Sequence, residues 1–438
     1  MSAPRQASGR WDLRYETLAA VTAVARLATA TKAFCNCVVS DDGAPNEHTC
    51  PVCLGLPGTL PVLNARAVER AADAALALGA TVQVVSSFSR EHQPPSPLRP
   101  KGYVLTQSER PLALRGYVQI GETPEGSPIQ IPVRCAYVTE DAGRGVHGRF
   151  ANESALDYNL AGAPLLVVEG ASGLRSPAEV RAYVASLAAV LRDVGAWAGT
   201  PGDGTLSVTA RVAVRGRGDL SAGAECEIRH LTALDDVEHA VEAECERQAA
   251  LRDIGAEVEP RALLWDAEAG EASPARTPDT PAWHLVDPDL PPLMLTAEWL
   301  DARRAALPEL GPARRARLRT AYDLDGPALE AVTGDLHFAE YYETVARLHG
   351  DGPAAAQWMQ QHVLPFMARE GVTTRDVAVR ARPSDLARVL DLRRAGRLSD
   401  DAADRVFRTM LRTGLGPERA AEREGFVLAD PPEPARDA

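Results

Sequence analysis

The sequence predicts an α+β protein in which a mixed α/β domain is followed by all-helical regions. Short β-branched or alternating runs, broken by Gly and Pro turns, alternate with amphipathic segments up to about residue 292. Beyond that point the strand signals vanish and only helical patterns remain. With 438 residues, 45% of them apolar, the chain is long enough for two or three domains with real cores.

The first part is predicted to hold a sheet and three marked helices. The predicted strands lie at residues 81–85, 117–120, 129–133, 165–168 and 206–214. Ser176 as N-cap, Pro177 at the first helical position and Glu179 in a capping box predict a helix that ends near Gly195. Two further amphipathic helices are expected after Asn64 and at residues 234–254.

The second part is predicted to be helical after an acidic, Pro-rich loop. That loop covers residues 257–292, and a domain boundary is expected at its end. Packed helices follow at residues 295–371, with a break at 350–353, and then shorter ones with Ser caps and Gly stops at 384–396, 399–414 and 417–424. The predicted domains are residues 12–293, 294–371 and 372–429, with a disordered tail at 430–438.

Charge and hydropathy exclude some classes of protein. The net charge of −13 argues against nucleic-acid binding through a globally positive field. Arginines clustered at residues 303–319 leave two interpretations open, a local phosphate-binding face or solvated helix surfaces. No segment approaches the roughly 18 apolar residues of a membrane span, so we expect a cytoplasmic protein without membrane contact.

Four of the seven cysteines form two closely spaced pairs. Cys35 and Cys37 are followed, after a polar turn, by Cys50 and Cys53. Two such pairs can converge on one tetrahedral zinc ion, and a closed four-sulfur site folds a loop rather than catalyses. The alternatives are four ordinary buried cysteines, or redox chemistry at the second pair. The remaining cysteines, Cys135, Cys226 and Cys245, are assigned to packing.

The cysteine pairs lie within a longer ordered string of motifs. These motifs are KAFCNC at 32–37, GAPN at 43–46, CPVCLGLPGTLPVLN at 50–64, PKGY at 100–103, EDAG at 140–143, VHG at 146–148, DYN at 157–159 and DPDLPPL at 287–293. In this order they resemble the zinc-binding form of the B subunit of glutamyl/aspartyl-tRNA amidotransferase, over about residues 15–427. The resemblance implies a mixed α/β cradle domain with a four-cysteine zinc knuckle, an all-α helical domain, and a short helical tail domain of the YqeY type that is truncated here.

The resemblance also implies an activity and partners. Such subunits convert Glu or Asp misacylated on a tRNA into Gln or Asn. ATP first makes an acyl phosphate, with Mg²⁺ spreading the phosphoryl charge, and ammonia then attacks. The ammonia comes from a separate amidase subunit (GatA-like), and a small C subunit completes the complex. The implied class is therefore a carbon–nitrogen ligase that uses glutamine as amido donor and binds aminoacyl-tRNA.

Site residues carry over position by position. The resemblance implies catalytic roles for Glu140, Asp141 and His147, and zinc ligation by Cys35, Cys37, Cys50 and Cys53. It implies cofactor-binding roles for Lys101, Gln107, Asp157, Tyr158 and Asn159. For the charged residues among these, the alternative is a capping or solvated role in a turn.

Several positions depart from the family pattern. The family's Gly-Leu-Glu-Val-His-Val-Gln-Leu strand aligns with residues 20–27, so its acid becomes Thr22 and its imidazole Val24. Further replacements are Tyr137, Thr139, Leu160, Ser207 and Thr209. Neither threonine nor valine can replace a charged ligand of Mg²⁺. The pattern leaves three hypotheses: a working B subunit, a paralogue that binds aminoacyl-tRNA or a partner without kinase activity, for instance in secondary metabolism, and a purely structural partner.

Overall fold

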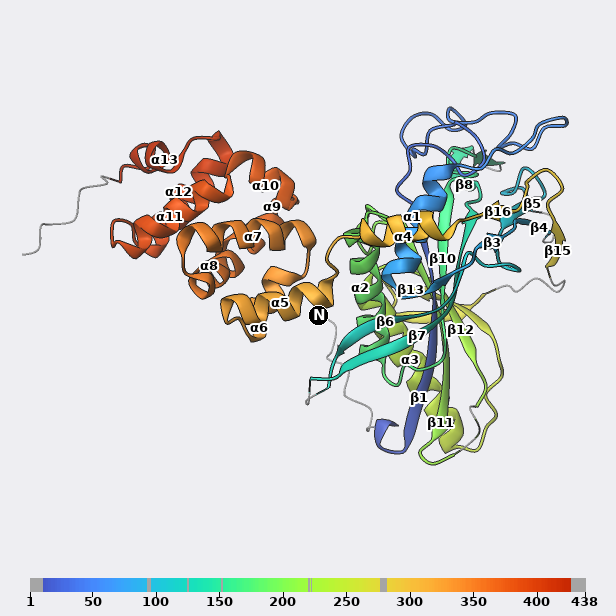
Figure 1. Cartoon of the computed structure of the whole chain (residues 1–438). Coiled ribbons are helices and arrows are strands. Elements are labelled where there is room, and N and C mark those ends of the chain that lie inside the picture. The colour runs from blue at the N-terminus through green and yellow to red at the C-terminus, as the bar shows by residue number, and fades with distance from the viewer. Residues whose placement is uncertain are drawn as a thin grey trace, which may run out of the picture. The chain divides into compact units, whose positions relative to one another are not determined.

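The computed structural model describes residues 11–92, 96–123, 126–150, 153–219, 221, 223–275 and 282–426, without the side chains of 147–150 and 153–154. Contacts divide the chain into two compact units, Met1–Pro308 and Glu309–Ala438 (Figure 1). The first unit is mixed α/β and the second is helical, which confirms the predicted fold class. The predicted domain boundaries remain a prediction, and the tail at 430–438 lies outside the described residues.

The first unit is built on one large mixed sheet. Its strands run in the order β14-β13-β12-β11-β1-β10-β7-β5-β4-β15, with β6 also pairing β7 and β2 pairing β6. Two small sheets, β16-β3 and β8-β9, complete the unit. The strands are β1 (Tyr15–Arg26), β2 (Thr81–Val82), β3 (Val85–Ser86), β4 (Ser89–His92), β5 (Tyr103–Thr106), β6 (Ala113–Glu122), β7 (Pro128–Glu140), β8 (Arg144–Phe150), β9 (Glu153–Asp157), β10 (Pro164–Gly170), β11 (Leu206–Gly216), β12 (Cys226–Leu231), β13 (Ala262–Asp266), β14 (Glu271–Pro274), β15 (Trp283–Val286) and β16 (Leu293–Met294).

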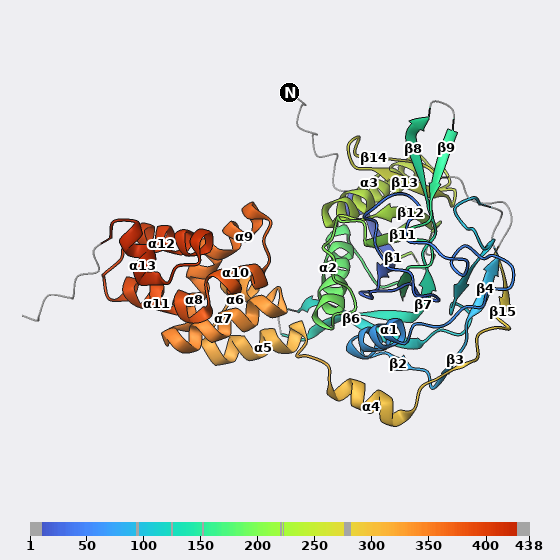
Figure 2. The same ribbon diagram turned by 90° about the horizontal axis from the view of Figure 1, so that it is seen from above.

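Alternation along β1 shows how the sheet separates its two faces. The side chains of Val21, Ala23 and Ala25 are buried, whereas Thr22 and Val24 between them are only half-buried. Side chains two apart on a strand share a face, so one face lies under the helices and the other is more open. We call the side that carries Thr22 and Val24 the open face. Figure 2 shows α2 and α3 together on one side of the sheet.

The helices of the first unit follow local start and stop signals. They are a short 3₁₀ turn (Trp11–Leu13), α1 (Ala65–Ala77), α2 (Pro177–Asp193), α3 (Leu234–Asp253) and α4 (Ala297–Ala305). Ser176 caps α2 by accepting from Glu179 N at 3.2 Å, and Asn64 caps α1 by accepting from Arg66 N at 2.9 Å. The three helices predicted in this part are confirmed.

The prediction of a loop over residues 257–292 is wrong in part. Strands β13 and β14 extend the sheet at one edge, and β15 forms the other edge beside β4. Each contains no more than five residues, too few for an alternating pattern to stand out among acids and prolines. β13 pairs with the more distant β12, where Glu227 lies opposite Ala262, and β15 pairs with the distant β4, whereas β14 pairs with the adjacent β13. Tertiary contacts, and not the local sequence pattern, therefore determine that these segments form strands.

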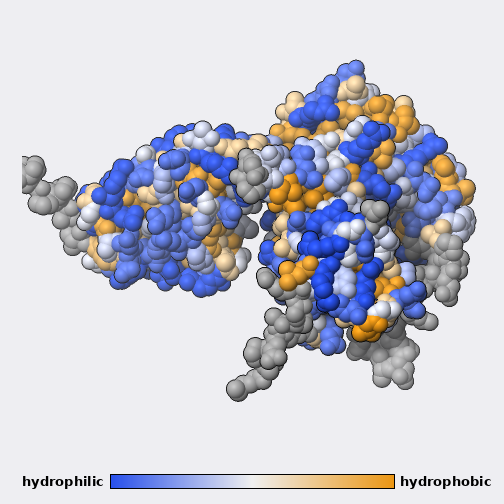
Figure 3. Space-filling model, turned by 90° about the horizontal axis from the view of Figure 1, so that it is seen from below, coloured by the Kyte–Doolittle hydropathy of each residue, from blue (hydrophilic) through white to orange (hydrophobic). Residues whose placement is uncertain are grey.

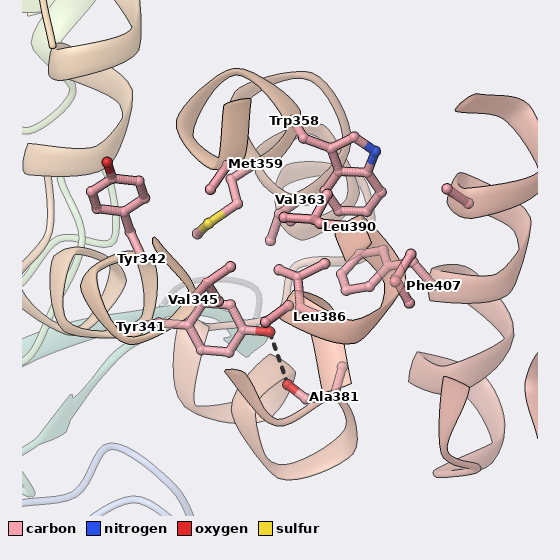
Figure 4. Close-up of a cluster of buried hydrophobic side chains, with 14 of the residues drawn as sticks. Tyr341, Tyr342, Val345, Trp358, Met359, Val363, Ala381, Leu386, Leu390 and Phe407 are labelled. Atoms are coloured by element: carbon pink, nitrogen blue, oxygen red, sulfur yellow. Dashed lines mark hydrogen bonds between the residues drawn. The ribbon is translucent and has the colours of Figure 1, made fainter. Parts of the chain in front are cut away.

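The second unit is a helical bundle with its own core. Its helices are α5 (Gly311–Tyr322), α6 (Gly326–Thr333), α7 (Leu336–His349), α8 (Gly352–Trp358), α9 (Leu364–Glu370), α10 (Thr374–Arg380), α11 (Pro383–Arg394), α12 (Asp400–Thr413) and α13 (Pro417–Arg423). Figure 4 shows Trp358, Leu390 and Phe407 converging in this core. In the same cluster the Tyr341 hydroxyl donates to Ala381 O at 2.9 Å. The predicted break at 350–353 is confirmed, because Gly350 ends α7 in the left-handed region at φ 75°.

A π turn, Met359–Val363, joins α8 to α9. Pro365 lies just beyond it and has no N–H for the helical ladder, which favours a local change of hydrogen bonding there. On the face seen in Figure 3 the helical unit is mostly hydrophilic, with scattered hydrophobic residues. Within the described ranges, no helix combines the length and apolar character needed to span a membrane.

Candidate functional site

The four paired cysteines come together at one end of the first unit. The sulfur atoms of Cys35, Cys37, Cys50 and Cys53 all lie within 4.8 Å of one another. A tetrahedral ion with Zn–S bonds of about 2.3 Å requires sulfur separations of about 3.8 Å, so the set fits zinc. All four sulfurs form one cluster, as expected for a closed structural site and not for isolated packing cysteines.

The thiols are not equivalent. A hydrogen bond from Cys35 and the nearby Lys32 ammonium lower the pKa of the Cys53 thiol to about 4. Burial raises the pKa of Cys37 to about 11. Metals bind thiolates, and the surroundings of Cys53 favour its thiolate form.

Lys32 is the buried cation of the cysteine cluster. Its Nζ donates to His48 O at 2.8 Å and to Tyr158 O at 3.2 Å, and lies 3.6 Å from Cys53 Sγ. The residue is completely buried. A buried ammonium offsets the negative charge of a four-thiolate site and ties the cysteine loop to the segment after β9.

The Asp157-Tyr158-Asn159 segment holds the loop between the two cysteine pairs. Asp157 Oδ1 accepts from Asn46 N at 3.0 Å, and Asn159 Oδ1 accepts from His48 N at 2.8 Å. Asn159 Nδ2 also donates to Ala44 O at 2.9 Å. Burial raises the pKa of Asp157, but the N–H groups of Asn159 and Asn46 and the Arg144 guanidinium outweigh it and keep the pKa below its ordinary value of 3.8. These contacts tie the turn at 44–48 to the sheet unit.

Lys101 and Glu140 form a buried ion pair beside the cysteine cluster. Lys101 Nζ lies 2.6 Å from Glu140 Oε2 and also contacts Oε1, and Leu105 N donates to Glu140 Oε1 at 2.8 Å. The two side chains are 10% and 2% exposed. They line a cavity of about 240 Å³, with Phe34, Tyr103, Cys35 and Cys53 among its walls. The ammonium lies 5.7 Å from the centroids of both aromatic rings.

These two residues, Lys32 and Lys101, are the only lysines in a chain with 47 basic residues. Everywhere else the chain uses arginine. An ammonium is compact and points its donors in a tetrahedral arrangement, whereas a guanidinium is a flat fork. The compact ammonium suits both buried positions, where its donors reach several acceptors. Sequence reasoning overlooked Lys32, and the scarcity of lysine is the signal that identifies it.

Gln107 lies apart from the cavity contacts. Gln107 is fully buried, accepts from Val138 N at 3.0 Å and donates to Ser86 Oγ at 2.9 Å. Its polar atoms thus link neighbouring strands, and a cofactor-binding role remains a prediction. His147 is in β8, but its side chain lies outside the described residues.

Four positions that are predicted to depart from the family pattern meet on the open face. Thr22 of β1 pairs with Thr209 of β11 on one side and with Glu169 of β10 on the other. Two residues further along β1, Val24 pairs with Ser207. In antiparallel strands directly opposed residues share a face, so these side chains form adjacent rows.

Glu169 is the carboxylate within these rows, and it is engaged. It accepts from the Tyr137 hydroxyl at 3.0 Å and pairs with Arg134. Burial raises the pKa of Tyr137 to about 12. Among the described residues, the four cysteines are the only group of three or more His, Cys, Asp or Glu side chains close enough to hold a metal. Thr22, Val24, Ser207 and Thr209 supply no charged ligand for Mg²⁺, and the Glu169 carboxylate is already engaged.

Asp141 and Arg26 lie where β1 and β7 end. Arg26 Nη2 is 3.8 Å from Asp141 Oδ2, and Asp141 Oδ1 accepts from Ala142 N at 2.8 Å. Burial raises the pKa of Asp141, against the hydrogen bond from Ala142 and the charge of Arg26. Sequence reasoning did not identify Arg26 as a site residue.

Several of the arginines at 303–319 have partners within their own unit. Arg303 donates to Asp73 Oδ1 at 2.8 Å, and Arg317 pairs with Glu309 and Glu343. Arg314 is buried and donates to Glu309 O at 3.0 Å. Their main described contacts are structural ion pairs and hydrogen bonds.

Comparison with known proteins gives consistent matches along the chain. The family model of the GatB/GatE catalytic domain matches residues 23–301, and that of the GatB domain, of the YqeY type, matches residues 340–433. The B subunit of the aspartyl/glutamyl-tRNA(Asn/Gln) amidotransferase of Solidesulfovibrio magneticus is 36% identical over 94% of this chain and 86% of its own length. The corresponding B subunits of Moorella thermoacetica and Nitrosospira multiformis are each 34% identical, over 95% and 91% of this chain and 87% and 81% of their own lengths.

Fold and site together define a sheet unit fastened by a four-cysteine loop and followed by a helical unit. That is the class expected of a GatB/GatE-type catalytic domain joined to a GatB tail domain. The chain belongs to the GatB family of amidotransferase B subunits.

Proposed function

We propose that this chain is the B-type component of a tRNA-dependent amidotransferase. In that role it holds the aminoacyl end of a misacylated tRNA while the side-chain carboxylate is converted to an amide. The observation that carries the proposal is the match over 94% of the chain to a relative of that name, with the cysteine loop and its hydrogen bonds intact. We further propose that the loop holds structural zinc.

The proposed partners are an amidase subunit that supplies ammonia, a small C subunit, and an aminoacyl-tRNA. Names of the relatives support the tRNA-linked role. The test is co-expression with the amidase and C subunits, followed by conversion of Glu-tRNA(Gln) or Asp-tRNA(Asn) with glutamine and ATP. Amidated aminoacyl-tRNA supports the proposal. Unchanged aminoacyl-tRNA, in a complex that assembles and hydrolyses glutamine, contradicts it.

A second candidate is a specialised paralogue that binds aminoacyl-tRNA or a partner protein without kinase activity. The observation in its favour is the open face, where Thr22, Val24, Ser207 and Thr209 offer hydroxyls and a methyl-bearing side chain but no charged ligand. The melting temperature of the protein, measured with and without ATP and Mg²⁺, separates the two candidates. A ligand that binds only the folded state raises the melting temperature of the protein. No shift at saturating nucleotide favours the paralogue, and a clear shift favours the family reaction.

A third candidate, a structural partner that binds no RNA, is favoured by the net charge of −13. A salt titration of tRNA binding distinguishes it from the other two. Phosphate contacts release counterions, so log K must fall steeply with log of salt concentration if the chain holds tRNA. Absence of tRNA binding at low salt contradicts the first candidate and the tRNA-binding form of the second, and favours the structural role.

A further inference from the structure

Helix α3 borders a groove over the outer strands β13 and β14 of the large sheet. Gln248 fixes the helix over β11, because its side chain accepts from Val214 N at 2.9 Å and donates to Val212 O at 3.1 Å. The sheet continues past β11 through β12 to β13 and β14 (Figure 2). Between α3 and these last two strands lies a cavity of about 860 Å³.

The floor of this groove is apolar. Trp265 lies opposite Ala272, and Leu263 lies opposite Pro274. Opposed residues and residues two apart on a strand share a face, so these four side chains lie together on the groove side of the sheet. Ala272 and Pro274 are small, which leaves room above β14 for a longer side chain that enters from outside the sheet.

The wall of the groove is acidic. Five carboxylates and two guanidinium groups line it, which leaves a net charge of −3 with His239 neutral. Arg247 is already used, because it donates to Glu244 at 2.8 and 2.7 Å. His239, Glu242 and Glu246 are exposed and follow one another at spacings of three and four residues, so they form one stripe along α3. The groove therefore attracts cations and repels nucleic-acid phosphate.

β14 is an edge strand, which among the described residues pairs only with β13. Ala275 N donates to Ala262 O at 2.8 Å, and hydrogen-bonded pairs alternate with non-hydrogen-bonded pairs in an antiparallel ladder. The N–H and C=O of Ala272 therefore point away from β13, toward the free edge. Pro274 shares that orientation but has no N–H, so the edge suits a short segment better than a long strand.

We infer that the free edge of β14 and the acidic groove form a docking site for an extended, basic segment of a partner protein. The segment adds antiparallel beside β14 through the main-chain groups of Ala272. Its Lys or Arg side chains reach over Ala272 and Pro274 to the acidic stripe of α3. Free main-chain groups select a peptide, and the negative charge selects a basic one. The docking site is separate from the amide-forming role proposed above and does not depend on it.

The test measures binding of short fluorescent peptides to the full chain by fluorescence anisotropy. A peptide of alternating lysine and threonine should bind at least about tenfold more tightly than one with glutamate in place of lysine. Ala272→Pro removes the outward N–H but neither a charge nor a bond to β13, and should weaken the lysine peptide about tenfold. Glu242→Gln/Glu246→Gln should weaken it as well. The matched control is Glu330→Gln/Glu422→Gln, which removes the same charge from exposed positions of the helical unit and should keep the affinity.

Modified peptides test the same contact without changing the protein. A residue opposite Ala272 shares its face and exchanges both main-chain hydrogen bonds with it, so the residues that bond to β14 are the lysines. N-methylation of the lysine amides should therefore weaken binding, whereas N-methylation of the threonine amides should not. Hydrogen exchange at Ala272 should become slower when the unmodified lysine peptide is bound.

Equal binding of the lysine peptide to the wild-type chain and to Ala272→Pro, with an unchanged melting temperature, overturns the inference. Indifference to N-methylation of the lysine amides overturns it too, because the peptide is then held by charge alone. Two further outcomes identify another occupant and also contradict the inference. Slow exchange at Ala272 without peptide means that the chain itself covers the edge, and a concentration-dependent dimer that Ala272→Pro abolishes means that a second copy does.

Discussion

The cysteine loop and the open face of the sheet lie in the same unit but differ in how completely their polar groups are hydrogen-bonded. In the loop, Lys32, Asp157 and Asn159 each make several hydrogen bonds, so backbone and side-chain groups are paired. On the open face, Arg26 makes two long ion pairs, 4.0 Å to Asp41 and 3.8 Å to Asp141, and its Nε has no acceptor within the described ranges. Saturated polar networks rigidify a structure, whereas unused donors and acceptors are available to a ligand.

This difference separates residues that stabilise the fold from residues that are available to bind a ligand. Groups that the family resemblance assigns to a cofactor, Asp157 and Asn159, have their bonding capacity taken up within the protein by the cysteine loop. Groups that the resemblance does not assign, such as Arg26, retain capacity. A loop can therefore be preserved as a scaffold while the neighbouring face changes its ligand chemistry. The following changes test this comparison, from the largest expected effect to the smallest.

Removing a zinc ligand should have the largest effect. Cys50→Ser takes one sulfur from the cluster, and structural zinc sites contribute on the order of 10 kcal/mol to folding in small zinc domains. We expect loss of bound zinc and a marked fall in soluble yield. Metal analysis of freshly purified protein provides the measurement. Cys226→Ser, at a buried thiol that donates to Glu259 O, should retain full zinc, and a zinc-free wild-type protein contradicts the prediction.

Breaking the buried ion pair should cost less. Lys101→Met leaves the Glu140 carboxylate buried without its cation, a change that typically costs about 3–5 kcal/mol. The double variant Lys101→Met/Glu140→Gln removes the pair as a unit and should recover most of that loss. Urea unfolding of the three proteins measures both values. If the single variant is as stable as wild type, the pair is not as enclosed as its contacts indicate.

Replacing the cation of the cysteine cluster should lower the affinity for zinc without unfolding the unit. Lys32→Met removes the ammonium near Cys53, and loss of a group around metal ligands typically lowers affinity about 10–100-fold. Competition with a chelating dye measures the change. The Lys101→Met/Glu140→Gln variant is the control, because it removes the other lysine but should retain wild-type zinc affinity.

Acid should loosen the turn at 44–48 through Asp157. The folded-state pKa of this carboxyl is below its ordinary value of 3.8. The unfolded chain thus binds the proton first, so the stability from Asp157 is complete above the ordinary pKa and is lost as pH falls through the lower folded-state value. Asp157→Asn should remove this acid-dependent part. Hydrogen exchange at residues 44–48 between neutral and acidic pH measures it, and identical profiles for both proteins contradict the assignment.

Adding a carboxylate to the open face should have the smallest effect and sharpen the comparison. Thr22→Glu places an acid directly opposite Glu169. Like charges on opposed strand positions typically cost about 0.2–1 kcal/mol, and a divalent cation would relieve that repulsion. We expect a lower melting temperature that rises again with Mg²⁺, and no Mg²⁺ response from Thr22→Gln. A response of the wild-type chain to Mg²⁺ alone would show that the face already binds the ion.

The sequence predicts the elements that depend on local chemistry. Ser176, Pro177 and Glu179 define the start of α2, and the spacing of Cys35 to Cys53 predicts the cluster. The small edge strand β15 escapes prediction because its pairing with β4 joins residues far apart in the sequence. The bonding of Asp157 is also hidden, since its partner Asn46 lies 111 positions earlier. Contacts of that kind arise from tertiary structure, and no local sequence pattern predicts them.

Because lysine occurs at only two positions, only two side chains of the chain can react with amine-specific reagents. Lys32 is completely buried and the Lys101 side chain is only 10% exposed, so both are largely shielded from acylating and cross-linking reagents that target primary amines. Such reagents reach Lys32 or Lys101 only when the cysteine loop or the adjoining cavity opens. The extent of modification at these two side chains, read by mass spectrometry, therefore reports on opening of this end of the molecule without any engineered label.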